Sequence, residues 1–79
     1  MKVDIFVTLK KGVLDPQGKA IKGSLEKLGY PEVKSVRLGK FIELELGDIP
    51  KEKVSKRIEE MSRKLLANTV IEDFRYDVK

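Results

Sequence analysis

The segment Gly12–Ala20 is the part of this chain that comes nearest to a phosphate-binding motif. It follows a predicted strand and opens a predicted helix, as a P-loop does. A P-loop needs four residues between its glycines and Ser or Thr after its Lys, because that hydroxyl binds magnesium. Here five residues separate Gly12 from Gly18, Ala20 follows Lys19, and Asp15 puts a carboxylate where phosphate would lie. We therefore interpret the segment as a capped helix start with an exposed lysine.

Glu43 and Glu45 are the carboxylates best spaced for acid–base chemistry, because residues two apart on a strand share one face. The sequence contains no histidine and no cysteine. That excludes zinc sites built on these residues, and no nucleophile motif accompanies the two carboxylates. We predict no catalytic residue and no metal site, and we interpret the pair as a solvated strand edge.

Phe6 and Phe41 lie on predicted strands, where they could stack nucleobases as the sheet aromatics of RNA-recognition domains do. Asp4, Glu43 and Glu45 fall on the same face, however, and would repel a phosphate backbone. The net charge of +4 is modest, and Lys and Glu are mixed along the chain. We predict no nucleic-acid partner. Phe6 and Phe41 are instead candidates for an oligomer interface, with isolated surface phenylalanines as the alternative.

Short elements must position these residues, and the first two are well marked. Alternating apolar residues over Val3–Leu9 predict a half-buried strand. Asp15 and Pro16 then predict a helix N-terminus, by capping free N–H groups and by fixing the first helical φ. The helix carries an apolar stripe and ends at Gly29; the stripe is Ile21, Leu25 and Leu28.

Two further strands are predicted around Val33–Leu38 and Phe41–Leu46, with a turn at Gly39. A three-residue turn brings the apolar residues of both strands to one face, so we expect Gly39 at a positive φ. One long bent strand is the alternative. A second helix begins near Asp48–Pro50, Asn68 is a plausible left-handed cap, and a last strand spans Val70–Val78. The apolar stripe of this helix is Val54, Ile58, Met61 and Leu65.

The predicted fold is α+β: a two-layer, ferredoxin-like β-α-β-β-α-β sandwich with an antiparallel sheet and two helices on one face. Arg37 would join Phe6, Phe41 and the carboxylates on the helix-free face. A chain of 79 residues predicts a single domain over 1–79 with a marginal core, so we expect a dimer or larger oligomer. The N-terminus lacks the apolar block of a signal peptide and no apolar run is long enough for a membrane span, which predicts a cytoplasmic protein with no membrane partner.

Three segments, in order and covering nearly the whole chain, resemble the PurS family. The first is Val7–Lys10 with Gly12–Ile21, the second is Val36–Leu44, and the third is Lys64–Asn68 with Val70–Phe74. The chain departs from the family pattern at Thr69, where Pro is common, and at Ser62, where Cys is common. Neither position is expected to be catalytic.

This resemblance implies a non-catalytic subunit of phosphoribosylformylglycinamidine synthase, in purine biosynthesis. Its partners would be a large synthetase subunit and a glutaminase subunit, beside a homodimer or higher homo-oligomer. The complex is an ATP-dependent amidoligase with glutamine as amido donor. ATP and magnesium would bind the synthetase subunit, and this chain would bind no cofactor. Its role would be to hold the other two subunits together and to assist ammonia transfer.

Some loop segments carry the resemblance although they contribute little to packing of the core. We regard them as candidates for contact with partners. These partner-contact candidates are Asp15, Gln17, Lys19, Arg37, Lys40 and Asn68. Turn and cap chemistry is the alternative explanation for Asp15, Gly18, Gly39 and Asn68. A small-molecule-binding regulatory domain of the same fold is the alternative function.

Overall fold

Three strands and two helices follow one another in the computed structural model, which describes residues 1–79. The α+β class, the antiparallel sheet and the two helices are confirmed. In chain order the elements are β1 (Lys2–Leu9), α1 (Pro16–Lys27), β2 (Gly39–Glu45), α2 (Lys51–Met61), a π-helical turn η1 (Ser62–Leu66) and β3 (Glu72–Val78).

The core lies between one face of the sheet and α2. The strand order is β2-β1-β3 and both pairings are antiparallel. Because side chains alternate along a strand, the apolar set of β1 faces α2 and the intervening residues face the other way. The buried apolar residues are Val3, Ile5, Val7, Val54, Ile58 and Ala67.

The predicted strand over Val33–Leu38 does not form, so the sheet has three strands. This segment runs beside the start of α1 instead, where the Leu38 N–H donates to the Asp15 carboxylate. The positive φ predicted for Gly39 is also wrong, because Gly39 is the first residue of β2 and pairs with Thr8. A Cβ at Gly39 would collide with the Val7 carbonyl oxygen, so close approach to β1 is what requires glycine here.

Helix α1 begins and ends as the sequence predicts. Asp15 caps the Gly18 N–H and Pro16 is the first helical residue. Gly29, at φ 100°, follows the last turn, where the Leu28, Gly29 and Tyr30 N–H groups return to carbonyls of the helix. Neither α1 nor α2 is long and apolar enough to cross a membrane.

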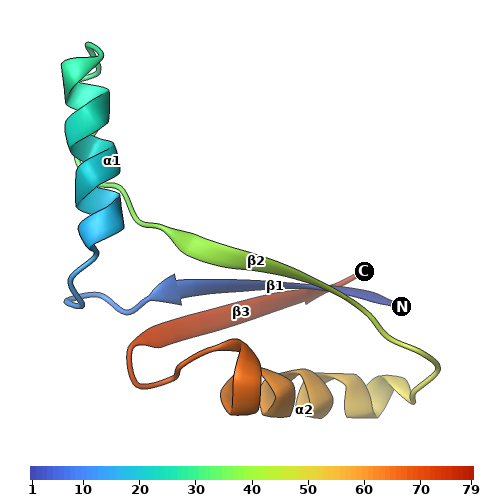
Figure 1. The fold of residues 1–79 in the computed structure, drawn as a ribbon. Helices are drawn as coiled ribbons and strands as arrows, with labels where there is room; N and C mark the ends of the chain where they lie inside the picture. The colour runs from blue at the N-terminus through green and yellow to red at the C-terminus, as the bar shows by residue number, and fades with distance from the viewer.

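Helix α1 does not lie on the sheet, so the expected pair of helices on one face is not found. Figure 1 views the sheet nearly edge-on, with α2 against one face and α1 rising on the side of the other. Contact between α1 and the other elements is slight. The radius of gyration is 16.0 Å, whereas a compact chain of this length would have about 12 Å. We call residues 10–38, which leave and rejoin the sheet around α1, the arm.

Helix α2 continues into the π-helical turn η1, and this changes which residues face the core. Ser62 is fully buried, whereas Leu65, predicted on the buried stripe, is 83% exposed. A π turn holds more residues than an α turn, so it rotates later side chains off the stripe. The left-handed conformation predicted for Asn68 is wrong, since the turn ends in an extended residue at Ala67.

Candidate partner interface

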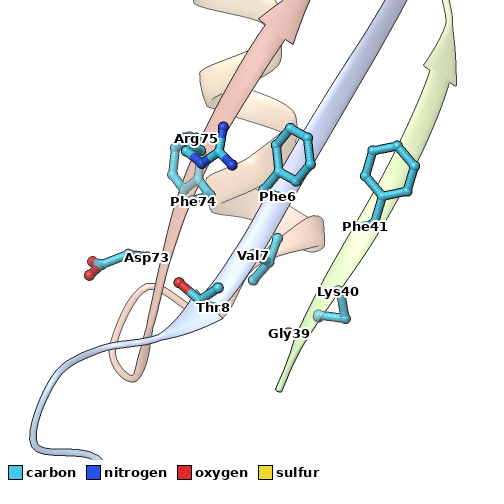
Figure 2. A pocket seen from close by; sticks show the side chains of 9 residues that line it. All are labelled: Phe6, Val7, Thr8, Gly39, Lys40, Phe41, Asp73, Phe74 and Arg75. Atoms are coloured by element: carbon cyan, nitrogen blue, oxygen red, sulfur yellow. The ribbon is translucent and has the colours of Figure 1, made fainter. Parts of the chain in front are cut away.

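The helix-free face of the sheet carries a row of three stacked side chains, one from each strand, which we call the aromatic row. Phe6 pairs with Phe41 on β2 and with Arg75 on β3. The two rings stack with centroids 5.1 Å apart, and the Arg75 guanidinium carbon lies 4.1 Å from the Phe6 centroid. Figure 2 looks onto this row, beside a shallow depression of about 360 Å³. The row is a flat apolar surface with a cation at one end.

An acidic row crosses the same face beside the aromatic row, toward the chain termini. Asp4 pairs with Glu43 on β2 and with Asp77 on β3. The nearly buried Asp4 carboxylate accepts from the Lys79 ammonium at 2.6 Å, which raises the pKa of Lys79. Glu45 extends the acidic region along β2. One lysine therefore neutralises the central carboxylate, while the outer ones stay exposed.

The base of the arm is held in place by Asp15. Its two carboxylate oxygens accept from the Leu38 and Gly18 N–H groups, each at 2.9 Å. These two hydrogen bonds hold the pKa of Asp15 below its usual value, and the bond from Leu38 has the larger effect on that pKa. The nearby positive charge of Arg37 acts in the same direction. Since Leu38 lies 23 residues further along the chain, this carboxylate fixes both ends of the arm to each other.

A depression of about 480 Å³ lies at the same base. Four cationic residues contribute to its lining, and Asp15 is the one carboxylate there. Because Asp15 already accepts two backbone N–H groups, the depression presents positive charge to its surroundings. The cationic residues are Lys10, Lys11, Lys19 and Arg37.

Three of the six partner-contact candidates have contacts within the chain. Asp15 clamps the arm, as described. The Lys40 ammonium donates to the Leu66 carbonyl at 3.2 Å and lies 3.9 Å from the Glu72 carboxylate. The Asn68 side-chain oxygen accepts from the Val70 N–H, and the Asn68 backbone N–H donates to the Glu72 carboxylate. Asp15 and Asn68 thus make turn and cap contacts of the kind that the alternative explanation describes, whereas Lys40 links β2 to the end of η1.

The other three candidates, Gln17, Lys19 and Arg37, are exposed and make no side-chain hydrogen bond or ion pair. All three lie on the arm. Arg37 does not join the helix-free face as expected, because its segment is outside the sheet. The structure brings Lys19 and Arg37 together at the basic depression, whereas Lys40 and Asn68 lie with the end of η1.

The two oligomer-interface candidates, Phe6 and Phe41, share the helix-free face as predicted; the register of β1 with β2 also makes them neighbours, and Phe41 is 56% exposed. Arg75 was not among the predicted candidates. It alternates with Phe74 and Tyr76 along β3, and the register of β1 with β3 brings it onto Phe6. No group of three or more His, Cys, Asp or Glu residues is arranged to hold a metal ion.

Comparison with known proteins places this arrangement in a family. Residues 2–79 match the model of PurS, described as phosphoribosylformylglycinamidine (FGAM) synthase. The chain is 47% identical over 78 residues to the PurS subunit of phosphoribosylformylglycinamidine synthase from Bacillus subtilis, covering 99% of this chain and 92% of that protein. It is 42% identical over 78 residues to the same subunit from Methanocaldococcus jannaschii, covering 99% and 94%.

Solved structures agree. The chain is similar to Bacillus subtilis PurS with a TM-score of 0.89 and 47% identity, covering 99% of this chain and 96% of that one. It is similar to a chain in the structure of PurLQS from Thermotoga maritima with a TM-score of 0.86 and 38% identity, covering 96% and 93%. The resemblance seen in the sequence is therefore confirmed over almost the full length, and this chain belongs to the PurS family.

Proposed function

We propose that this chain is the small, non-catalytic subunit of a phosphoribosylformylglycinamidine synthase. The observation that carries the proposal is the family match over residues 2–79, with relatives named as this subunit. The complex converts formylglycinamide ribonucleotide to formylglycinamidine ribonucleotide in purine biosynthesis, with glutamine as the amido donor.

In this proposal the chain acts as one cytoplasmic domain that organises two other subunits. The glutaminase releases ammonia from glutamine, and the synthetase binds ATP and magnesium and adds the ammonia to its substrate. This chain holds the two together so that ammonia passes between their sites. Its shape supports such a role, since a sheet and a projecting arm offer surfaces that point in different directions (Figure 1).

We assign contact with other subunits to residues whose side chains make no hydrogen bond or ion pair within the chain. Phe6 and Phe41 serve self-association, because a stacked apolar pair on an open sheet face, half-buried at Phe6 and exposed at Phe41, is stabilised by a covering subunit. Gln17, Lys19 and Arg37, which lie on the arm, contact the other subunits of the assembly. Asp15, Lys40 and Asn68 support these contacts indirectly, by fixing the arm and the end of η1.

Reconstitution tests the function. The synthetase and glutaminase subunits of the same genome are assayed with and without this chain, once with glutamine and once with ammonia. We expect glutamine-dependent synthesis to require the chain, while ammonia-dependent synthesis does not. If neither activity responds to the chain and sizing shows no complex, the assignment is wrong. The regulatory-domain alternative then predicts a thermal shift of the chain alone with an amino acid or nucleotide.

The contact residues are tested in the same assay. Lys19→Glu combined with Arg37→Glu should weaken assembly while the far-ultraviolet circular dichroism stays unchanged. Lys53→Glu with Lys56→Glu is the matched control, since both lysines are exposed on the outer side of α2. Assembly that is equally strong in both double variants would contradict the assignment of the arm residues.

A further inference from the structure

The end of α2 holds one residue more than its buried stripe needs. The stripe residues Val54, Ile58 and Met61 are spaced by four and then three positions, so the next stripe position of an α-helix falls four residues after Met61, at Leu65. In the structure Leu66 packs against the core instead, and Leu65 is 83% exposed. The extra residue is taken up in η1, and its effect is an outward-facing leucine.

The π-helical turn is held in place at two points. Its own hydrogen bond joins the Ala67 N–H to the Ser62 carbonyl, five residues back, at 2.8 Å. The Lys40 ammonium on β2 donates to the Leu66 carbonyl at 3.2 Å. Single π-helical turns at α-helices are rare and are frequently found at functional sites. An α-helix with one residue fewer would bury a leucine equally well, so packing of the core does not explain the extra residue.

Further exposed apolar side chains lie in the connection that follows η1. Val70 is 79% exposed and Ile71 is 40% exposed. The connection turns tightly, because the Asn68 carbonyl accepts from both the Ile71 and the Glu72 N–H groups. We call Leu65, Val70 and Ile71 the end patch. The connection between α2 and β3 lies at the end of the sheet where the arm begins, opposite the chain termini (Figure 1).

We infer that the extra residue of η1 serves assembly: it turns Leu65 outward, and the end patch docks an apolar, carboxylate-bearing surface of another subunit of the complex. This inference rests on the proposed function and deepens it, because it adds a contact surface outside the arm and the aromatic row. The location of the end patch and its charge identify the kind of partner.

The location separates the end patch from the surface that serves self-association. Helix α2 lies against the face of the sheet opposite the aromatic row, and η1 continues α2 (Figure 1). A subunit that packs on Phe6 and Phe41 therefore leaves the helical side of the molecule open. The exposure of Leu65 calls for a different partner.

The charge next to the end patch is positive. Residues 61–71 contain Arg63 and Lys64 and no Asp or Glu. Lys64 forms no ion pair, while Arg63 lines a polar depression that also includes Glu59 and Asp73. Glu72, which follows the patch, already accepts a backbone N–H and pairs with a lysine of β2. The unmatched charge beside Leu65 is thus cationic, and a partner with a carboxylate beside its apolar side chains complements it.

The fixed turn favours docking. Because η1 is already held by hydrogen bonds from the helix and from the sheet, little of the chain must be ordered when a partner binds. Full burial of one leucine or valine side chain corresponds to roughly 10- to 100-fold in affinity. Leu65 and Val70 are therefore large contributors to assembly for the small area they occupy.

Substitutions of similar size test the docking. In one variant Leu65→Gln and Val70→Thr make the patch polar without changing the net charge. In the matched control Leu65→Met and Val70→Ile keep it apolar. Light-scattering mass measures the binding of each variant to the synthetase and glutaminase subunits of the same genome. We expect the dissociation constant of the polar variant to rise by roughly 10-fold or more, and that of the control to stay close to the wild-type value.

Charge reversal tests the carboxylate of the partner. Lys64→Glu should weaken the same binding, because it places like charges together. The difference from the wild type should shrink as salt is raised, since salt screens contacts between exposed charges. Lys53→Glu, on the outer side of α2, is the matched control and should leave the binding unchanged.

Removal of Leu65 tests the extra residue itself. The helix then continues with Leu66 four residues after Met61, so we expect a Tm equal to or above that of the wild type, together with weaker binding to the other subunits. Removal of Arg57 is the matched control. It rotates the later stripe residues by about 100° relative to Val54 and should lower Tm.

Three outcomes overturn the inference. The first is equal binding by the polar and the apolar variants. The second is a polar variant whose only change is a lower mass of the chain alone, because a second copy then covers the patch. The third is a chain without Leu65 that is as unstable as the chain without Arg57, because the fold then needs the extra residue.

Reconstituted activity separates this inference from the proposed function. If glutamine-dependent synthesis requires the wild-type chain while the polar and apolar variants bind equally well, only the inference fails. If the wild-type chain binds neither subunit and changes neither activity, the proposed function fails as well.

Discussion

Replacing Gly39 with alanine tests the close approach of β2 to β1. A Cβ there would collide with the Val7 carbonyl oxygen and lie 3.0 Å from Thr8 Cγ2. The carbonyl belongs to the buried central strand and cannot move freely, so overpacking should cost about 1–3 kcal/mol. Loss of unfolded-state entropy returns about 0.4–1 kcal/mol. The net destabilisation is about 1–2 kcal/mol, which lowers Tm by about 5–15 °C in a domain of this size.

Thermal unfolding followed by circular dichroism measures this change. Each variant is measured at the same set of protein concentrations, because the self-association proposed above would make Tm concentration-dependent. Gly23→Ala is the matched control, since no atom lies within 4 Å of its Cβ position and its φ is not positive. It should leave Tm equal or slightly higher, because alanine favours a helix interior by up to about 1 kcal/mol. An unchanged or raised Tm for Gly39→Ala would refute the reasoning and mean that the strand end relaxes.

Three further predictions concern the core and the clamp. The buried Ser62 hydroxyl has no hydrogen-bond partner, so Ser62→Ala should raise the free energy of unfolding by about 1 kcal/mol, while exposed Ser55→Ala changes it little, as urea titration would show. Leu65→Ala should cost less than about 0.5 kcal/mol and Ile58→Ala about 2–5 kcal/mol; equal costs would mean that η1 does not turn Leu65 outward. The pKa of Asp15 is lowered in the folded chain, so its stabilisation is present above the unfolded value of about 4 and is lost as pH falls below it. Circular dichroism should therefore show a smaller loss of helix on acidification for Asp15→Asn than for the wild type.

Local sequence signals predicted the elements whose causes are local. Alternation marked β1, and Asp15 with Pro16 marked the start of α1. The segment Val33–Leu38 was predicted wrongly because the Leu38 N–H is taken by a carboxylate far back in the sequence. Its apolar alternation was real, but the segment does not pair with the outer edge of β2, which stays free. Leu65 was misplaced for a similar reason, since helical periodicity assumes that the turn stays α-helical.

In the candidate interface, too, some features follow from the local sequence and others depend on long-range pairing. Phe6 and Phe41 share a face because both lie on alternating strands, and this follows from the sequence. The addition of Arg75, and the acidic row around Asp4, depend on the register between strands distant in the chain. The projecting arm could not be foreseen, because its capping signals specify a helix but not where that helix lies.

The strand order has a consequence for how the chain is made. Of the three strands, the central strand β1 is synthesised first and its neighbour β3 last. Val3 pairs with Val78, so one edge of β1 has no partner within the sheet until β3 has been synthesised. Pairing between such distant residues must overcome a large loop-closure entropy, which slows folding. Until β3 has been synthesised, the nascent chain therefore carries an apolar strand with one unpaired edge, and an unpaired edge of this kind favours aggregation.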